Sequence, residues 1–257
     1  MGTGPAAARW RELQQGRGIP PEILVRAPRS PWRHDPKDFG APAQADDTPS
    51  RRVALELLGP GGGTVMDVGC GGGVASLALV PPATELTGVD HNPGMLAAFA
   101  ADCEHRGVRY QTVEGAWPEI APKAGTADVV VCHHVGHNTV ELAPFLAALG
   151  AAARRGVVFE MLAEHPMAWL DPLWLQFHDL RRPPSATVDD AIAVLAEIGV
   201  TPTVTRWERG ARHRRTPEAV AHWLCLPLER ADEVAAALAD LPQRQRQVAT
   251  LRWPGTA

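Results

Sequence analysis

Short apolar runs alternate with helical stretches from residue 64 onward. Runs at residues 64–68, 85–90 and 108–113 predict strands, and the first two are followed by stretches with helical signals. The run at residues 127–132 is mostly β-branched, which is typical of a strand covered on both faces. Repeated strand and helix units of this kind predict an α/β domain with a largely parallel sheet.

The second half of the pattern completes the predicted sheet. Residues 156–161 and 200–207 predict two further strands, and Thr187 with Asp190 predicts a capping box for the helix between them. Residues 245–253 can return as a final edge strand. We therefore predict a seven-stranded, mostly parallel sheet with a reversed last strand.

Three segments fall outside this pattern. Residues 1–47 hold seven prolines, so we expect no long helix there and assign them to an N-terminal arm with short turns. Residues 48–257 form the predicted domain, in which residues 163–186 and 211–241 are accessory lid or helical segments. The arm also carries large rings that need a surface to dock on, and packing against the domain is favoured over substrate contact for Trp10, Trp32 and Phe39.

Composition limits the classes of function. A chain of 257 residues with 45% hydrophobic content can close one sizeable core. Its net charge of -4 gives no global field that would hold a polyanion, so we do not expect nucleic acid as a partner. The chain has no apolar stretch approaching the roughly 20 residues of a membrane helix, and its four cysteines are dispersed. These features predict a cytoplasmic protein without a membrane partner or a disulfide framework.

The most informative motif is a strand that breaks into glycines where a helix begins, at residues 65–73. Such a turn lets the backbone approach a ligand closely and directs free amides at it. In the dinucleotide fingerprint the third glycine would stand at Val74 or Ser76, depending on the register, so neither register matches. Asp67, two residues before the first glycine, would repel a diphosphate but attract the ammonium of an amino-acid-like ligand.

A second carboxylate supports the same kind of ligand. Asp90 ends the predicted strand at residues 85–90. A carboxylate there can accept hydrogen bonds from both hydroxyls of a ribose. The alternative is a simple helix N-terminal charge next to Asn92. Together, the two carboxylates and the glycine turn indicate a zwitterionic ligand that carries adenosine.

With these motifs the stretch from about Thr48 to Trp207 resembles class I methyltransferases, which use S-adenosylmethionine (SAM) on a Rossmann-like fold. The resemblance implies contacts to the methionine part of SAM from Asp67, Gly69, Cys70, Gly71 and Gly73. It implies a ribose contact for Asp90, an adenine neighbour in His91 and a packing neighbour in Met95. The adenine turn falls on Gly115, Ala116 and Trp117, with Ala116 where the family usually has an acidic residue, and the fourth-strand motif carries His133 and His134 as pocket wall.

Histidines gather after the fourth predicted strand. On a strand, His133 and His134 would point to opposite faces, and no second cluster has zinc-like spacing, so we expect no metal. If the acceptor must lose a proton, the candidate bases near strand ends are His137, His165 and His178, together with Glu160. The substrate wall is expected to include Trp32, Trp169 and Trp174, although residues 164–178 are equally consistent with a packed helix.

We expect methyl transfer from SAM to a small-molecule acceptor, which yields S-adenosylhomocysteine (SAH). One alternative is a catalytically inactive SAM-binding protein that serves as a regulatory or partner subunit. Another is an RNA methyltransferase, for which the arginine run at residues 206–215 is the supporting feature. An NAD-dependent oxidoreductase is disfavoured by the glycine register and by Asp67. The sequence leaves a homodimer open.

Overall fold

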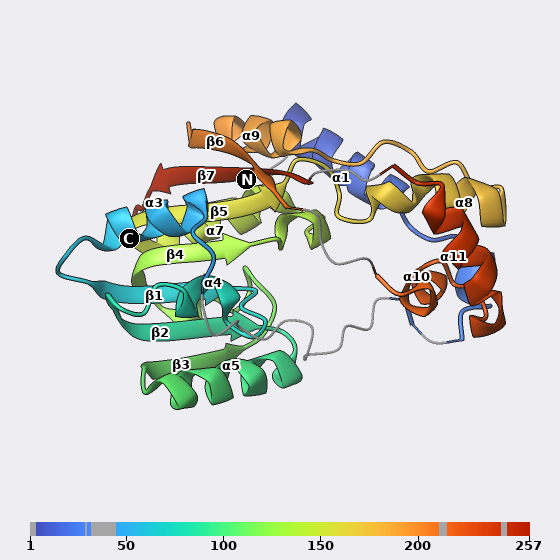
Figure 1. Cartoon of the computed structure of the whole chain (residues 1–257). Coiled ribbons are helices and arrows are strands. Elements are labelled where there is room, and N and C mark those ends of the chain that lie inside the picture. The colour runs from blue at the N-terminus through green and yellow to red at the C-terminus, as the bar shows by residue number, and fades with distance from the viewer. Residues whose placement is uncertain (1–3, 29, 32–44, 211–214, 243–245) are drawn as a thin grey trace.

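The computed structural model describes residues 4–28, 30–31, 45–210, 215–242 and 246–257. A seven-stranded sheet with the order β3-β2-β1-β4-β5-β7-β6 forms its centre (Figure 1). The strands are β1 Gly63–Val68, β2 Ala83–Asp90, β3 Arg109–Glu114, β4 Ala127–His133, β5 Ala153–Leu162, β6 Thr203–Arg209 and β7 Arg246–Pro254. The predicted Rossmann-like sheet with a reversed last strand is confirmed.

One detail of the predicted sheet is wrong. The last strand β7 is not at the edge, because it runs antiparallel between β5 on one side and β6 on the other. The edge strand at this end of the sheet is β6, which therefore runs in the same direction as β1 to β5. Strand order depends on contacts between residues far apart in the chain, which periodicity does not report.

Helices cover both faces of the sheet. The helices are α1 Pro5–Gly16, α2 Pro21–Leu24, α3 Pro49–Leu58, α4 Val74–Leu77, α5 Pro93–Arg106, α6 Ala121–Ala124, α7 Leu142–Ala152, α8 Asp171–His178, α9 Val188–Glu197, α10 Pro217–Trp223 and α11 Ala231–Ala239. Alternate residues of β1 supply the two sides: Met66 and Val68 join the core beneath α1, α7 and α9, whereas Val65 joins the core beneath α3, α4 and α5. This is the period of two that a doubly covered strand requires.

The N-terminal arm differs from its prediction. Pro5 occupies the first turn of α1, where its missing amide costs nothing, and no further proline occurs before Pro20. The intervening residues therefore form a helix of 12 residues, which packs against α9 and α7. Trp10 is fully buried and donates from Nε1 to the carbonyl of Thr139 at 2.7 Å. Trp10 thus packs against the domain, whereas Trp32 and Phe39 lie outside the described residues.

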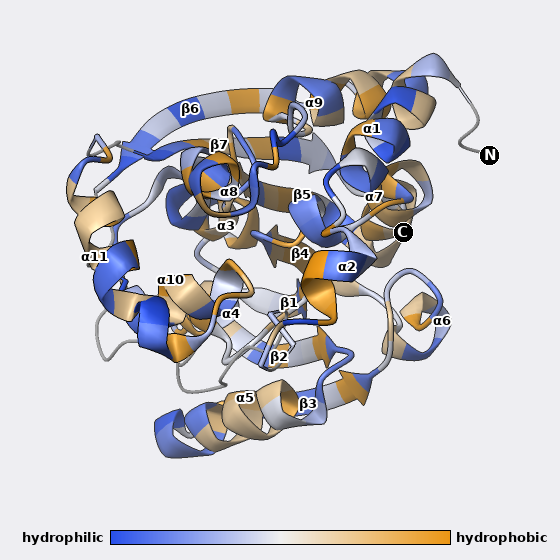
Figure 2. Ribbon diagram, turned by 90° about the vertical axis from the view of Figure 1, so that its right-hand side faces the viewer, coloured by the Kyte–Doolittle hydropathy of each residue, from blue (hydrophilic) through white to orange (hydrophobic). Residues whose placement is uncertain are grey.

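A separate cluster of helices stands beyond the carboxyl ends of the parallel strands (Figures 1 and 2). It combines α2, α8, α10 and α11, which come from three distant parts of the chain, around Leu170, Trp174 and Leu224. The accessory segment predicted at residues 211–241 contains two helices, α10 and α11, which are separate because Cys225 adopts a left-handed φ of 57° and Pro227 follows it. Among the described residues, no helix is both long and apolar enough to cross a membrane.

Candidate active site

A cavity of about 2420 Å³ lies between the carboxyl edge of the sheet and the helical cluster. Its wall includes the turn after β1, the ends of β2, β4 and β5, and parts of α8, α10 and α11. Most of the predicted site residues line it: Asp67, Gly69, Cys70, Gly71, Asp90, His91, Met95, Gly115, Ala116, Trp117, His133, His134, His137, His165, Trp169 and Trp174. Gly73 and His178 are not part of this wall, and Trp32 lies outside the described residues.

The turn after β1 requires glycine for two reasons. Gly69 has a φ of 71° and Gly71 a φ of 51°, both in the left-handed region that side chains disfavour. A Cβ on Gly69 would also stand 2.4 Å from Cγ2 of Val135. Gly73 is glycine for packing, since its Cβ would meet Leu77 and Phe99 at 2.8 Å. Gly73 also has a left-handed φ of 81°, and its predicted contact with the cofactor stays a prediction.

Asp67 is buried at the base of this turn. Its Oδ2 accepts hydrogen bonds from the Ser76 hydroxyl at 2.7 Å and from the Ser76 amide at 3.2 Å. Burial raises the pKa of Asp67 to about 7, although the two bonds from Ser76 oppose that shift. Sequence reasoning missed Ser76, which stands where the dinucleotide fingerprint would have its third glycine, so the register mismatch was the available signal.

Asp90 is held by the backbone at the end of β2. Its Oδ2 accepts from the amide of Gly71 at 3.1 Å, and its Oδ1 accepts from the amide of Asn92 at 2.9 Å. Because a carboxylate has about four acceptor positions, two remain for a ligand. The neighbouring His91 side chain is 82% exposed, whereas Met95 is buried. The geometry thus presents a fixed carboxylate at the cavity wall with an open imidazole next to it.

The turn after β3 borders the same part of the cavity. The amide of Gly115 donates to the carbonyl of Asp90 at 3.0 Å, which ties the two strand ends together. Trp117 is anchored through its Nε1, which donates to the carbonyl of Phe145 at 3.2 Å. Ala116 is exposed between them. A ligand at this turn can therefore use backbone groups and the indole face, but not the indole N–H.

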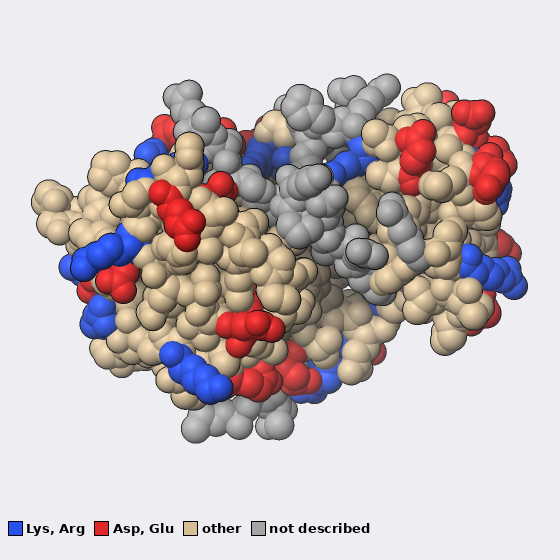
Figure 3. Space-filling view, turned by 90° about the horizontal axis from the view of Figure 1, so that it is seen from below, with Lys and Arg blue, Asp and Glu red and all other residues tan. Residues whose placement is uncertain are grey.

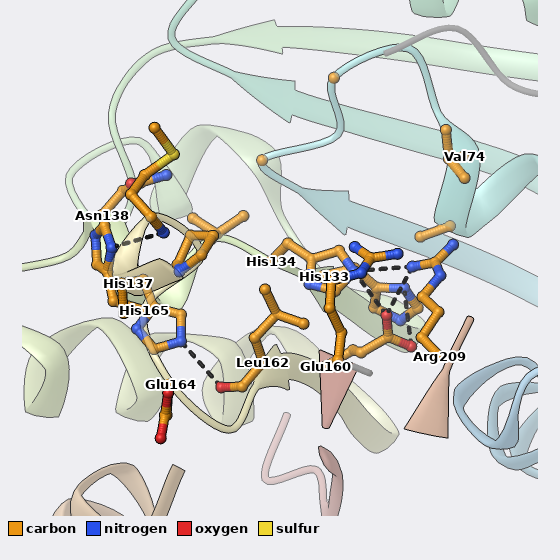
Figure 4. Close-up of a pocket in the computed structure, with 18 of the residues that line it drawn as sticks. Val74, His133, His134, His137, Asn138, Glu160, Leu162, Glu164, His165 and Arg209 are labelled. Carbon is orange, nitrogen blue, oxygen red and sulfur yellow. Dashed lines mark hydrogen bonds and ion pairs between the residues drawn. The ribbon is translucent and has the colours of Figure 1, made fainter. Parts of the chain in front are cut away.

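The two histidines after β4 converge, contrary to the prediction of opposite faces. His134 has a left-handed φ of 62°, so the strand ends at His133 and the alternation of side chains stops there. Nε2 of His134 lies 2.9 Å from Oε1 of Glu160, and Nδ1 of His133 lies 3.9 Å from Oε2. Arg209, at the end of β6, reaches the same carboxylate at 3.6 Å (Figure 4). Arg209 belongs to the arginine run at residues 206–215, and it contacts an anion, the Glu160 carboxylate, at the cavity wall.

His137 and His165 form a second group in the cavity (Figure 4). Nε2 of His137 lies 3.0 Å from the carbonyl of Leu162, which can only accept, so this nitrogen carries the hydrogen. Nδ1 of His165 accepts from the amide of Met167 at 3.1 Å, so the hydrogen of the neutral ring is on Nε2. Burial lowers the pKa of His137 to about 4 and that of His165 to about 3. Both rings are therefore neutral and weakly basic near pH 7.

The chain is similar to known methyltransferases. Residues 65–156 match the model of a methyltransferase domain. The chain is 36% identical over 109 residues to the ribosomal protein L11 methyltransferase of Vibrio campbellii, covering 40% of this chain and 37% of that protein. It is 32% identical over 120 residues to a ubiquinone biosynthesis O-methyltransferase of Methylobacterium sp., covering 44% and 47%. The chain thus matches less than half the length of either relative.

A solved structure of a putative methyltransferase from Bacillus halodurans has the same fold, with a TM-score of 0.57 at 13% identity. The match covers 80% of this chain and 99% of that one. The chain carries a class I SAM-dependent methyltransferase domain. The matched residues hold the glycine turn, Asp90 and the end of β4, which are the elements that the sequence had related to this family.

The residues of the methyltransferase domain fit the shape and charge of SAM. Asp67 and the glycine turn offer a carboxylate and backbone for an ammonium and carboxylate, and Asp90 offers two acceptor positions for ribose hydroxyls. His91 and Trp117 line the same cavity, and their contact with the adenine stays a prediction. The described residues contain no group of three or more His, Cys, Asp or Glu side chains arranged to hold a metal ion.

The helical cluster supplies the other wall of the methyltransferase cavity. Trp169 and Trp174 line it, whereas Nε2 of His178 contacts the carbonyl of Leu224 at 2.6 Å and its ring packs on Trp174 at 5.1 Å. His178 thus joins α8 to α10 and is not placed as a base. Sequence reasoning also missed Arg17, which is buried at this wall and binds Asp171 through both Nη atoms. Only the fold brings α1 beside α8, so no local signal identified Arg17.

Proposed function

We propose that this methyltransferase transfers a methyl group from SAM to a small-molecule acceptor held between the sheet and the helical cluster. The observation that carries the proposal is the single cavity that runs from the glycine turn and Asp90 to Trp169 and Trp174. One end has the groups that suit SAM, and the other has apolar and aromatic groups that suit a small organic molecule.

The chemistry requires little from the protein beyond alignment. Bound SAM supplies an electrophilic methyl group on a sulfonium. The chain positions the donor through the turn at Asp67 and Gly69, and it positions the acceptor against the wall at Trp169 and Trp174. Alignment of two bound reactants and exclusion of water account for most of the rate that such a transfer needs. Val135 packs on Gly69. It therefore connects the glycine turn to His133 and His134 at the end of β4.

The alternatives are less well supported. On the face shown in Figure 3, acidic and basic side chains are interspersed, which does not favour a nucleic-acid surface. Of the arginine run, Arg206 pairs with Asp189 and Arg209 with Glu160, so these two guanidinium groups are already partnered. The name of the Vibrio campbellii relative indicates a protein acceptor. A cavity covered by helices favours an acceptor that is smaller than a protein.

The experiment is a methyl-transfer assay with labelled SAM on three acceptor sources: a metabolite extract, total RNA and ribosomal protein. We expect label to enter only the metabolite fraction. The variant Asp90→Ala should lose this transfer, and Glu114→Gln is the matched control because Glu114 ends the neighbouring strand β3 and is exposed. Label in RNA or protein would replace the small-molecule proposal. SAH binding without transfer to any source would favour the regulatory alternative.

A further inference from the structure

The ends of β4, β5 and β6 bring together four polar side chains on the cavity wall. Glu160 is 3% exposed, and it faces His133, His134 and Arg209 (Figure 4). Each imidazole turns one nitrogen toward Glu160. The other nitrogens, Nε2 of His133 and Nδ1 of His134, are buried without a hydrogen-bond partner in the described part of the chain. A buried polar atom without a partner is costly, which is a reason to look for a ligand that supplies one.

The position of one hydrogen decides what His134 can do. Nε2 of His134 lies 2.9 Å from Oε1 of Glu160 and 3.1 Å from Nη1 of Arg209. This nitrogen holds either a hydrogen or a lone pair, so only one of the two contacts is a hydrogen bond. A lone pair facing an anionic oxygen at this distance would be repelled, whereas an N–H there makes a charge-assisted bond. Nε2 therefore carries the hydrogen, and Nδ1 carries the lone pair.

The charges around His134 support this assignment. Glu160 is ionised, because the hydrogen on Nε2 of His134 at 2.9 Å and the guanidinium of Arg209 at 3.6 Å both favour the carboxylate. Burial lowers the pKa of His133 although Glu160 opposes that shift, so His133 is neutral near pH 7. In the described part of the chain, Arg209 also lies 3.6 Å from Asp46, and His137 interacts electrostatically with His134. Glu160 thus has one cation, Arg209, and can stabilise a second if His134 takes up a proton.

We propose that His134 is the general base for an acceptor that is methylated on a neutral hydroxyl group, with Glu160 as its positioning residue. The inference rests on the proposed function and names the acceptor chemistry of the same site. In the step, the acceptor oxygen forms a bond to the methyl carbon while the carbon–sulfur bond breaks toward sulfur, and the hydroxyl proton passes to Nδ1 of His134. The positive charge lost at sulfur is regained on the imidazole, next to Glu160.

A hydroxyl on an aromatic ring fits this site best. An acceptor that is already an anion or a neutral tertiary amine has no proton to lose, so an oriented carboxylate and imidazole would add nothing to its rate. A phenolic hydroxyl is mostly protonated near pH 7 and therefore gains from a base. The same cavity is walled by Trp169, Trp174 and Trp223, which offer flat apolar faces for an aromatic ring.

The first test needs no substrate. Nitrogen NMR of the full chain with labelled histidine distinguishes a protonated ring nitrogen from one with a lone pair. We expect His134 to show a hydrogen on Nε2 and a lone pair on Nδ1 at pH 7.5, and His134→Gln identifies its signals. A hydrogen on Nδ1 would overturn the proposal, because that nitrogen could then only donate.

The second test compares substituted phenols that differ in how readily they ionise. For phenols that are protonated at the assay pH, His134→Gln should lower kcat by about 10²-fold or more. For nitrophenols that are already ionised, the loss should stay within about 3-fold, because no proton has to be removed. Glu160→Gln should show the same dependence with a smaller loss. His105→Ala, on the exposed end of α5, is the control that should change neither rate.

Two readouts separate this inference from the proposed function. SAH affinity should be unchanged within about 3-fold in both variants, so loss of that affinity would mean that the variants had damaged the fold or the donor site. The linkage in the labelled product of the metabolite extract is then identified. An O-methyl ether supports the inference, and an N-methyl or S-methyl product overturns it while leaving methyl transfer to a small molecule intact.

Discussion

The two ends of the cavity are built in different ways. The donor end comes from consecutive strands and turns, and the backbone fixes its side chains: Asp90 accepts from Gly71 and Asn92, and Asp67 accepts from Ser76. The acceptor end comes from α2, α8, α10 and α11, which meet only in the folded chain. Methyltransferases with different acceptors can therefore share the first end and differ in the second, because a change in the helical cluster does not disturb the strand tips.

The variant with the largest expected effect, Trp174→Ala, tests whether the helical cluster is energetically separate from the donor end. Trp174 is buried, packs on His178 and lies beneath the guanidinium of Arg182 at 5.2 Å. Trp174→Ala should lower the free energy of unfolding of this cluster by about 3–5 kcal/mol, measured by denaturant titration. SAH affinity should stay within about 3-fold of wild type.

The matched control for this variant is Leu175→Ala, because the next residue of α8 is 41% exposed and its removal should have little effect. If Trp174→Ala abolished SAH binding as well, the donor and acceptor ends would be energetically coupled, which would contradict their separation.

A second variant tests how strongly the turn after β1 depends on glycine at position 69. Gly69→Ala places a side chain in a left-handed conformation and against Val135, so the free energy of unfolding should fall by about 2–4 kcal/mol. Gly107→Ala is the control, since Gly107 has a φ of 65° but open space around it, and should cost only about 1 kcal/mol.

The double variant Gly69→Ala with Val135→Ala separates strain from collision. It should recover part of the loss, because the second substitution removes the methyl group that a Cβ on Gly69 would meet at 2.4 Å. If the double variant loses as much free energy of unfolding as the two single variants lose together, collision with Val135 is unimportant.

The donor end was predictable from the sequence because its signals are local. The glycines, Asp67 and Asp90 stand at strand ends that the apolar pattern marks, and Thr187 does cap α9 with Asp190 as expected. The acceptor end was predictable only as an aromatic segment. Its assembly from α2, α8, α10 and α11 depends on long-range packing, which the order of residues does not display.

The errors have different physical origins. A left-handed φ at His134 turned its side chain toward Glu160, and a pattern of alternating side chains cannot report a single backbone angle. The position of β7 between β5 and β6 required knowledge of which strands pair. The prolines of residues 1–47 predicted no long helix. The helix α1 forms nevertheless, because Pro5 stands in its first turn, which tolerates proline.

The smallest effect concerns pH at the donor end. Folding raises the pKa of Asp67 from 3.8 to about 7, so its contribution to stability is greatest below pH 4 and is lost as the pH rises through 7. An ammonium group of SAM would prefer the ionised form. SAM affinity should therefore rise between pH 6 and 8, by at most about tenfold per pH unit, with release of a proton.

Isothermal titration calorimetry in buffers of different ionisation enthalpy measures that proton. Asp67→Asn should remove both the proton release and the pH dependence, because the amide does not titrate in this range. A variant that keeps the wild-type pH dependence would show that another group binds the ammonium.

The most direct test of the account is the SAH affinity of Asp90→Ala relative to wild type, measured by calorimetry at pH 8. If the Asp90 carboxylate binds two ribose hydroxyls as proposed, its removal should cost about 3 kcal/mol, so we expect a loss of affinity of about 10²-fold with the fold intact. An affinity equal to that of wild type would show that the donor is not held at the tip of β2, and the assignment of the cavity would fail with it.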